Sequence, residues 1–156
     1  NVNEYQSYLD ESNVPGWQEH LVSHFPPKIP EDAHNIHVRY KFALLQGSGY
    51  LQLRYTLPPE TIQKLHEQYT KEKMQHSFTG GTWEGYRTKG ILTTLFYTSA
   101  SKSRIFPDDY EIMVFDIRPN DDHATNNNTT HNTEDAHGVA ISLQRNEIIY
   151  WAEWGS

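Results

Sequence analysis

The most constraining feature of the sequence is a run of alternating apolar residues that is followed by a turn and by a second such run. Every second position is apolar in residues 36–44, and the same alternation returns in residues 51–55. Because successive side chains of a strand point to opposite faces, each run predicts a strand with one buried face. The glycine-containing residues 46–49 predict a turn between them. Together these segments predict an antiparallel β-hairpin.

One later segment carries a clear helical pattern. Two prolines and Glu60 suit a first helical turn, where backbone N–H groups lack partners and an acidic side chain faces the positive end of the helix dipole. Ile62, Leu65 and Tyr69 then fall on one face. We expect a helix from about residue 59 to residue 74, with this stripe packed on a sheet.

The other apolar segments predict further strands without a strong helix between them. These strands are expected at residues 91–98, 110–117, 139–143 and 148–154. In the second of them Met113, Phe115 and Ile117 should share one face. Residues 76–89 and 99–109 are interpreted as irregular connections, the latter ending in a Pro-Asp-Asp turn.

These elements predict an α+β fold with about six strands in a mostly antiparallel sheet. One main helix should pack on one face, and a short helical segment should begin the chain. A parallel arrangement would need a helix between each pair of strands. The length of 156 residues corresponds to one domain. Within it, residues 1–30 are interpreted as a helical and extended lead-in, and residues 120–136 as a mobile polar loop.

Composition argues against several classes of function. The chain has 13 Lys and Arg against 20 Asp and Glu, a net charge of −7, and its basic residues do not cluster, so nucleic acid is not an expected partner. No apolar stretch approaches the length of a membrane-spanning helix. The absence of cysteine excludes disulfides, thiolate metal sites and a cysteine nucleophile.

The densest group of metal-binding residue types lies in and beside the polar loop. Imidazole and carboxylate groups bind divalent metals. The group consists of His123, His131, His137, Asp121, Asp122, Glu134 and Asp135. All of them belong to an Asn- and Thr-rich segment without a rigid element to orient ligands. The sequence therefore favours a solvated loop over a metal site, and we predict no cofactor.

Four aromatic residues are the best candidates for binding a ligand or partner. Trp83 and Tyr86 lie in a glycine-rich segment that would let them reorient, and no phosphate-loop motif is present there. Trp151 and Trp154 lie on opposite faces of the last strand, so a helix that covers one face would leave one of them exposed. Alternatively, the loop aromatics pack on the core, and N-terminal residues such as Trp17 and Phe25 cover the second face.

Recognisable catalytic motifs are missing from the sequence. No Ser-His-Asp order, glycine-flanked nucleophile or HExxH pattern appears. The paired carboxylates Asp108 and Asp109 fall in the expected turn. The remaining histidines are interpreted as surface or helix-face residues: His20, His24, His34, His37, His66 and His76. We therefore assign no catalytic residue.

Residues 29–36 read Ile-Pro-Glu-Asp-Ala-His-Asn-Ile, and a strand pair and a Pro-Pro-Glu helix start follow. This order resembles small bacterial cell-envelope domains, often lipoproteins, in which Pro-x-x-Ala-x-x-Ile precedes a strand pair and Pro-Pro-Glu begins a helix. The likeness covers about residues 29–70. It implies an extracytoplasmic location, with any lipid anchor upstream of Asn1, and it carries over no catalytic residue.

The function expected from these features is a non-catalytic extracytoplasmic domain, envelope-anchored or secreted, that binds a protein or a small molecule. Three alternatives remain open. They are a cytoplasmic acidic immunity or inhibitor protein that masks a basic site, a hydrolase whose site is assembled only in three dimensions, and a purely structural surface protein. A cleft that gathers polar residues from several strands would discriminate between them.

Overall fold

The fold is built around a six-stranded antiparallel sheet with the strand order β1-β2-β8-β7-β6-β3. The computed structural model describes residues 2–13, 19–41, 49–82, 96–97, 102–103, 105–119 and 134–155. The strands of the sheet are β1 (His34–Lys41), β2 (Gly49–Thr56), β3 (His76–Thr82), β6 (Ile105–Pro119), β7 (Glu134–Ser142) and β8 (Glu147–Trp154). A separate pair is formed by β4 (Phe96–Tyr97) and β5 (Lys102–Ser103). The predicted α+β fold is confirmed.

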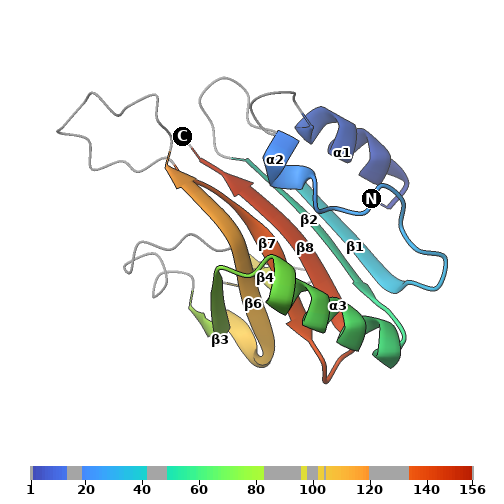
Figure 1. Cartoon of the computed structure of the whole chain (residues 1–156). Helices are drawn as coiled ribbons and strands as arrows, with labels where there is room; N and C mark the ends of the chain where they lie inside the picture. The colour runs from blue at the N-terminus through green and yellow to red at the C-terminus, as the bar shows by residue number, and fades with distance from the viewer. Residues whose placement is uncertain are drawn as a thin grey trace.

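The helices all lie on one face of the sheet (Figure 1). They are η1 (Val2–Glu4), α1 (Tyr5–Ser12), α2 (Glu19–Val22) and α3 (Pro59–Glu72). Ile62 of α3 is fully buried, and Leu65 and Tyr69 pack against the same cluster, which confirms the predicted stripe. In the described part of the chain no helix has the length and apolarity needed to cross a membrane.

The β1–β2 hairpin forms in the register that the alternation predicts. Val38 is the partner of Leu53, and Tyr40 is the partner of Leu51. β2 also pairs along its whole length with β8, which pairs with β7 on its other side. The last strand of the chain is therefore central, and all of its residues except Glu153 are buried. A central strand covered on both faces carries a nearly continuous apolar run.

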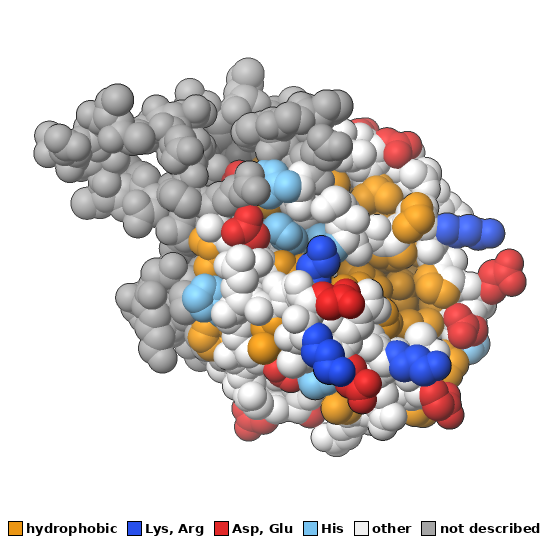
Figure 2. Space-filling model, in the orientation of Figure 1, with side chains coloured by type: hydrophobic (Ala, Val, Ile, Leu, Met, Phe, Trp, Pro, Cys, Tyr) orange, Lys and Arg blue, Asp and Glu red, His pale blue; other side chains and the backbone are white. Residues whose placement is uncertain are grey.

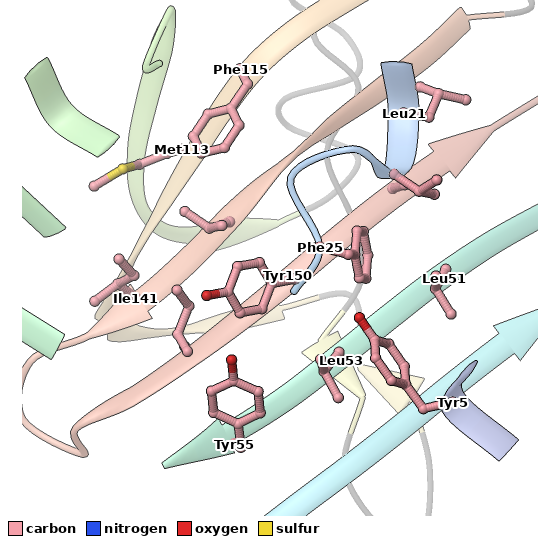
Figure 3. Packing of buried hydrophobic residues seen from close by; sticks show 14 of the residues in the cluster. Tyr5, Leu21, Phe25, Leu51, Leu53, Tyr55, Met113, Phe115, Ile141 and Tyr150 are labelled. Carbon is pink, nitrogen blue, oxygen red and sulfur yellow. The ribbon is translucent and has the colours of Figure 1, made fainter. Parts of the chain in front are cut away.

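The described N-terminal residues Tyr5, Leu21 and Phe25 pack on the helix-bearing face, whereas Trp17 lies outside the described residues. Tyr5, Leu21 and Phe25 belong to one buried cluster with residues of β2 and β8 (Figure 3). The ring of Phe25 lies 6.0 Å from that of Tyr150 between centroids. The idea that Phe25 covers the second face is therefore wrong. Between α1 and α3 apolar side chains reach the surface (Figure 2).

The second face carries its own buried cluster. From β8 it takes Ile149 and Trp151, whereas Tyr150 and Trp154 join the helix-side cluster, as the alternation predicts. Its other buried members are Phe96, Phe106, Tyr110, Ile112, Val114, Ala136 and Ala140.

β3 corrects the expectation of an irregular connection after residue 76. Residues 76–79 pair regularly with β6, and this strand lies at the edge of the sheet. An edge strand has one strand neighbour and needs little apolar surface. The segment is polar for this reason, so its sequence carries no strand signal. Its pairing then becomes irregular: Thr79 is opposite Glu111, whereas Gly81 is opposite Phe106. The expected Pro-Asp-Asp turn is therefore a bulge within β6.

A second bulge in β6 corrects the predicted facing of its side chains. Val114 pairs with Gly138 and Asp116 with His137, so Phe115 is an extra residue in the ladder. A bulge of this kind reverses the alternation beyond it. Met113 and Phe115 lie in the helix-side cluster as expected, but Ile117 packs against the opposite cluster.

The boundary of the predicted polar loop also needs correction. β7 begins at Glu134, and Ala136 is fully buried within it. Residues 134–136 are thus strand, because all three pair with β6 and residues 135 and 136 also pair with β8. Residues 120–133 of the predicted loop and residues 91–95 of an expected strand lie outside the described residues.

Candidate functional site

A cleft of about 230 Å³ lies where α3, β3 and β6 approach the turn between β7 and β8. Its lining residues come from all of these elements: His66, Thr79, Asp108, Asp109, Tyr110, Glu111, Ile141, Leu143 and Gln144. The cleft gathers polar side chains from several strands, which is the feature that the sequence alone could not reveal.

The β3–β6 irregularity shapes the acidic wall of the cleft. Residues 107–110 lie opposite Gly80 alone. Gly80 has a φ of 55°, a conformation that side chains other than glycine rarely adopt. A Cβ there would lie 2.8 Å from Oδ1 of Asp108. Glycine at this position therefore permits the bulge that brings Asp108, Asp109 and Glu111 to one side of the cleft.

Glu111, which lines the cleft, accepts hydrogen bonds from two side chains. Nε2 of His66 lies 2.7 Å from its Oε1, and the hydroxyl of Ser77 donates to its Oε2. Burial raises the pKa of Glu111, but the hydrogen bonds from Ser77 and His66 outweigh this effect and hold the pKa below its usual value. Ser77 thus points to a carboxylate and not to an imidazole base, unlike an activated nucleophile.

Asp109 is held by a second set of partners. Arg145 donates to both of its oxygens, with Nε at 2.7 Å and Nη2 at 3.2 Å, and the Ser142 hydroxyl lies 2.6 Å from Oδ2. Partial burial raises the pKa of Asp109, but the hydrogen bonds lower it by more, so the pKa lies below its ordinary value. The Arg145 guanidinium also lies 5.0 Å from the ring centroid of Tyr110.

The cleft therefore carries a negative charge at neutral pH. Asp109 and Glu111 are ionised because their pKa values are lowered. Asp108 is exposed beside them. The guanidinium of Arg145 is paired with Asp109 on this acidic wall. In a chain of net charge −7, such a concave surface attracts cations.

The group of metal-binding residue types in and beside the polar loop is only partly within the described residues. Glu134, Asp135 and His137 lie in β7, while His123, His131, Asp121 and Asp122 fall outside. In the part of the chain that the structure describes, no three His, Asp or Glu residues are placed to hold a metal ion.

The predicted aromatic surface is not formed by β8. Trp151 is 0% and Trp154 3% exposed, so the expectation that one of them faces solvent is wrong. Each indole lies over a glycine of a neighbouring strand. A Cβ on Gly138 would lie 3.0 Å from Cζ2 of Trp151, and one on Gly49 would lie 2.2 Å from Nε1 of Trp154. Trp83 and Tyr86 lie outside the described residues.

Sequence reasoning missed His66 and Glu111 as site residues. His66 was assigned to a helix face, although it follows Ile62 by one turn and so points toward the sheet. Glu111 shares the alternation of Met113 and Phe115, which predicts a carboxylate on the helix-covered side of β6. These two signals together could have indicated a polar contact between α3 and the sheet.

Comparison with known proteins assigns no family to the chain. No family model matches it, and neither a curated protein nor a solved structure gives a significant match. The chemistry of the cleft is therefore the basis for a functional proposal.

Proposed function

We propose that this protein is a non-catalytic binding domain whose cleft receives a positively charged group. The observation that carries the proposal is the acidic lining of the cleft: Asp109 is already paired with Arg145, but Asp108 and Glu111 leave the cleft negatively charged. Ile141 and Leu143 line the same cleft and would contact the aliphatic part of a cationic chain. The volume of about 230 Å³ suits one side chain or a small amine better than a drug-sized ligand.

A hydrolase is supported less well by the same geometry. Acid–base hydrolysis by two carboxyl groups needs one of them protonated, which requires a raised pKa. Both carboxylates in the cleft have lowered pKa values instead. The Ser77 hydroxyl donates to Glu111, and the lowered pKa of that carboxylate makes it a weak general base.

The acidic inhibitor hypothesis uses the same chemistry as the proposed binding domain. A Lys or Arg side chain of a protein partner would present the positive group, and Leu143, which is 47% exposed beside the cleft, would add apolar contact at the rim. The chemistry of the cleft thus fits either a protein or a small-molecule source of the cation.

We also propose that the domain acts outside the cytoplasm, either anchored to the envelope or secreted. The support is the resemblance of residues 29–70 to bacterial envelope domains. Fractionation of cells that express the native gene tests this proposal. Recovery of the protein from the cytoplasm alone would contradict it and would favour the intracellular inhibitor alternative.

The cation proposal can be tested with a charged ligand and its neutral isostere. Nα-acetyl-arginine amide should shift the backbone amide NMR signals of residues 79, 108–111 and 142–144, whereas Nα-acetyl-citrulline amide should not. Asp108→Asn should weaken binding about two- to fivefold, the range expected for one exposed ion pair. Glu67→Gln, an exposed carboxylate elsewhere on α3, should leave binding unchanged.

Equal shifts from both ligands, or shifts confined to other surfaces, would contradict the cation proposal. The hydrolase alternative is tested separately with generic ester, phosphate and glycoside substrates. Turnover that disappears in Glu111→Gln would show that the cleft is catalytic.

A further inference from the structure

His24 fastens the N-terminal segment to the centre of the sheet. Its Nε2 lies 2.9 Å from the carbonyl oxygen of Gly138 and 3.1 Å from that of Trp151. Because carbonyl oxygens only accept, Nε2 must carry the hydrogen and donate it to both. On either side of His24 in the chain, Val22 and Phe25 are buried against the helix-side cluster. This side chain therefore joins residues 19–25 to β7 and β8 at one point.

The other ring nitrogen of His24 lies in a place that suits only the neutral form. Nδ1 is buried and has no hydrogen-bond partner among the described residues. In the neutral tautomer it is a bare lone pair, which an apolar site tolerates at modest cost. Protonation would create a buried, charged N–H without an acceptor, which costs the full desolvation of that group.

The rings around His24 are aromatic or are themselves histidines. Its ring centroid lies 4.7 Å from that of Phe25, 5.5 Å from Phe115 and 6.3 Å from Tyr150. His137 of β7 lies 4.9 Å away. His20 lies 6.1 Å from His137, so imidazoles of two segments gather here. Histidine side chains reach the surface on this face, in the upper half of the view (Figure 2).

Charged neighbours add to the penalty for a second positive charge. Burial has the largest effect, followed by His137 and by Lys73 after the end of α3, and together they lower the pKa of His24 to about 3. Burial raises the pKa of Tyr150 above its ordinary value, so this phenol is neutral and supplies no counter-charge. Within the described residues, no carboxylate contributes to the electrostatics of His24.

We propose that the contact of His24 with the two strand carbonyls is an acid-sensitive latch, whose protonation releases residues 19–25 and uncovers the apolar face of the sheet beneath them. The surface that would be uncovered includes Leu51 and Tyr150, which share the buried cluster with Leu21 and Phe25 (Figure 3). Acid would thus convert a covered face of β2 and β8 into an exposed apolar surface.

The direction of the pH effect follows from linkage. In the released segment His24 has an ordinary pKa near 6.5, and in the docked segment the pKa is about 3. The released state therefore takes up the proton first. The equilibrium constant for docking has its full value above pH 6.5, the pKa of His24 in the released segment. It falls tenfold per pH unit between this pKa and that of the docked segment. The docking constant should thus fall about tenfold between pH 7.5 and pH 5.5.

Amide hydrogen exchange of residues 19–25, corrected for the intrinsic pH dependence and measured with a chelator present, tests the latch. The wild-type protein should exchange about tenfold faster at pH 5.5 than at pH 7.5. His24→Gln, which keeps a donor but does not titrate, should abolish this change. His34→Gln, at an exposed position of β1, is the matched control and should keep it.

A direct titration of the His24 ring by NMR in the wild-type protein decides the proposal even where His24→Gln does not dock. The ring should remain neutral with its hydrogen on Nε2 at pH 5.5 in the docked protein. Protonation near pH 6.5 with the segment still docked would overturn the latch. Wild-type exchange that does not change with pH, or the same pH dependence in His24→Gln, would overturn it as well.

Discussion

The two faces of β8 are covered in different ways. On the helix side, Tyr150 and Ile148 meet residues of α2 and α3, which are short amphipathic segments. On the opposite side, Ile149 and Trp151 meet a cluster built largely from β6 together with Phe96 of β4. The residues that cover the helix side recur at helical spacing in the sequence. The cover of the opposite side depends on aromatic residues that strand pairing brings together.

The aromatic part of the second face forms a triangle of rings. The centroids of Phe96 and Phe106 lie 5.3 Å apart, those of Phe96 and Tyr110 5.5 Å, and those of Phe106 and Tyr110 5.6 Å. The Arg54 guanidinium lies 5.8 Å from the Phe96 ring centroid. Ring pairs at these distances are stabilising beyond their buried area. A face without a covering helix among the described residues can therefore still belong to the core.

The largest expected effect tests whether this second face is as essential as the first. Trp151 is fully buried, so Trp151→Ala should lower the free energy of unfolding by about 3–5 kcal/mol. Ile62→Ala on the helix side should cost about 2–4 kcal/mol. Urea unfolding followed by circular dichroism measures both.

Trp151→Phe is the matched control for the tryptophan. The indole Nε1 is buried, and no described residue accepts a hydrogen bond from it. Replacing the indole by a phenyl ring therefore removes an unsatisfied donor and keeps much of the apolar area. Its cost should be well below that of Trp151→Ala. A cost below about 1 kcal/mol for Trp151→Ala would mean that the second face is not part of the cooperative core.

The elements predicted from the sequence are those whose signal is local. The β1–β2 hairpin and the stripe of Ile62, Leu65 and Tyr69 follow from alternation and helical spacing. The edge strand β3 has no such signal, because it is a strand only through its pairing with β6. The predicted facing of Ile117 is wrong because an extra residue in β6 reverses the alternation before it. The bulge depends on the pairing of β6 with β7, which the sequence of β6 alone does not show.

The burial of both tryptophans and the cleft depend on distant positions. Trp151 and Trp154 are covered because glycines stand at their cross-strand partners, Gly138 and Gly49, which only the register reveals. The contact between His66 and Glu111 joins residues 45 positions apart. Residue types alone show which side chains can carry charge or donate hydrogen bonds. Which of them come into contact depends on how α3 packs on the sheet.

The two glycines offer a second comparison of the faces. A Cβ on Gly138 would lie 1.9 Å from the Met113 carbonyl oxygen, and this backbone is held in the middle of the sheet. Gly138→Ala should therefore cost about 1–3 kcal/mol as an overpacked site. At Gly49 the two nearest atoms, at 2.2 and 2.5 Å, belong to the side chain of Trp154 near the end of β8, and the nearest backbone atom, the Lys41 carbonyl oxygen, lies at 2.7 Å.

Gly49→Ala should consequently cost less than Gly138→Ala in the same urea experiment. An equal or larger cost would show that the ring of Trp154 is held as rigidly as the centre of the sheet. In that case the packing around Gly49 on the helix-bearing face would be as resistant to an added methyl group as the packing around Gly138 on the second face.

The smallest expected effect concerns the charges that border the second face. Asp109 is 17% exposed in its ion pair with Arg145, which also lies over Tyr110 of the aromatic cluster. Asp109→Asn should cost at most about 1 kcal/mol at pH 7. Asp108→Asn, at the exposed neighbouring position, is the control and should stay within about 0.5 kcal/mol.

The sign of the pH dependence separates the charge of Asp109 from simple packing. Its pKa in the folded protein is below the ordinary value of 3.8, so its stabilising effect is fully present above that value. The effect is lost as the pH falls through the folded pKa, because the carboxylate then takes up a proton and the ion pair with Arg145 ends. The difference between wild type and Asp109→Asn in urea unfolding should therefore be constant from pH 7 to about pH 5 and should shrink below pH 3.8. A difference that persists unchanged in acid would mean that the side chain acts through shape, and that the border of the second face needs no charge.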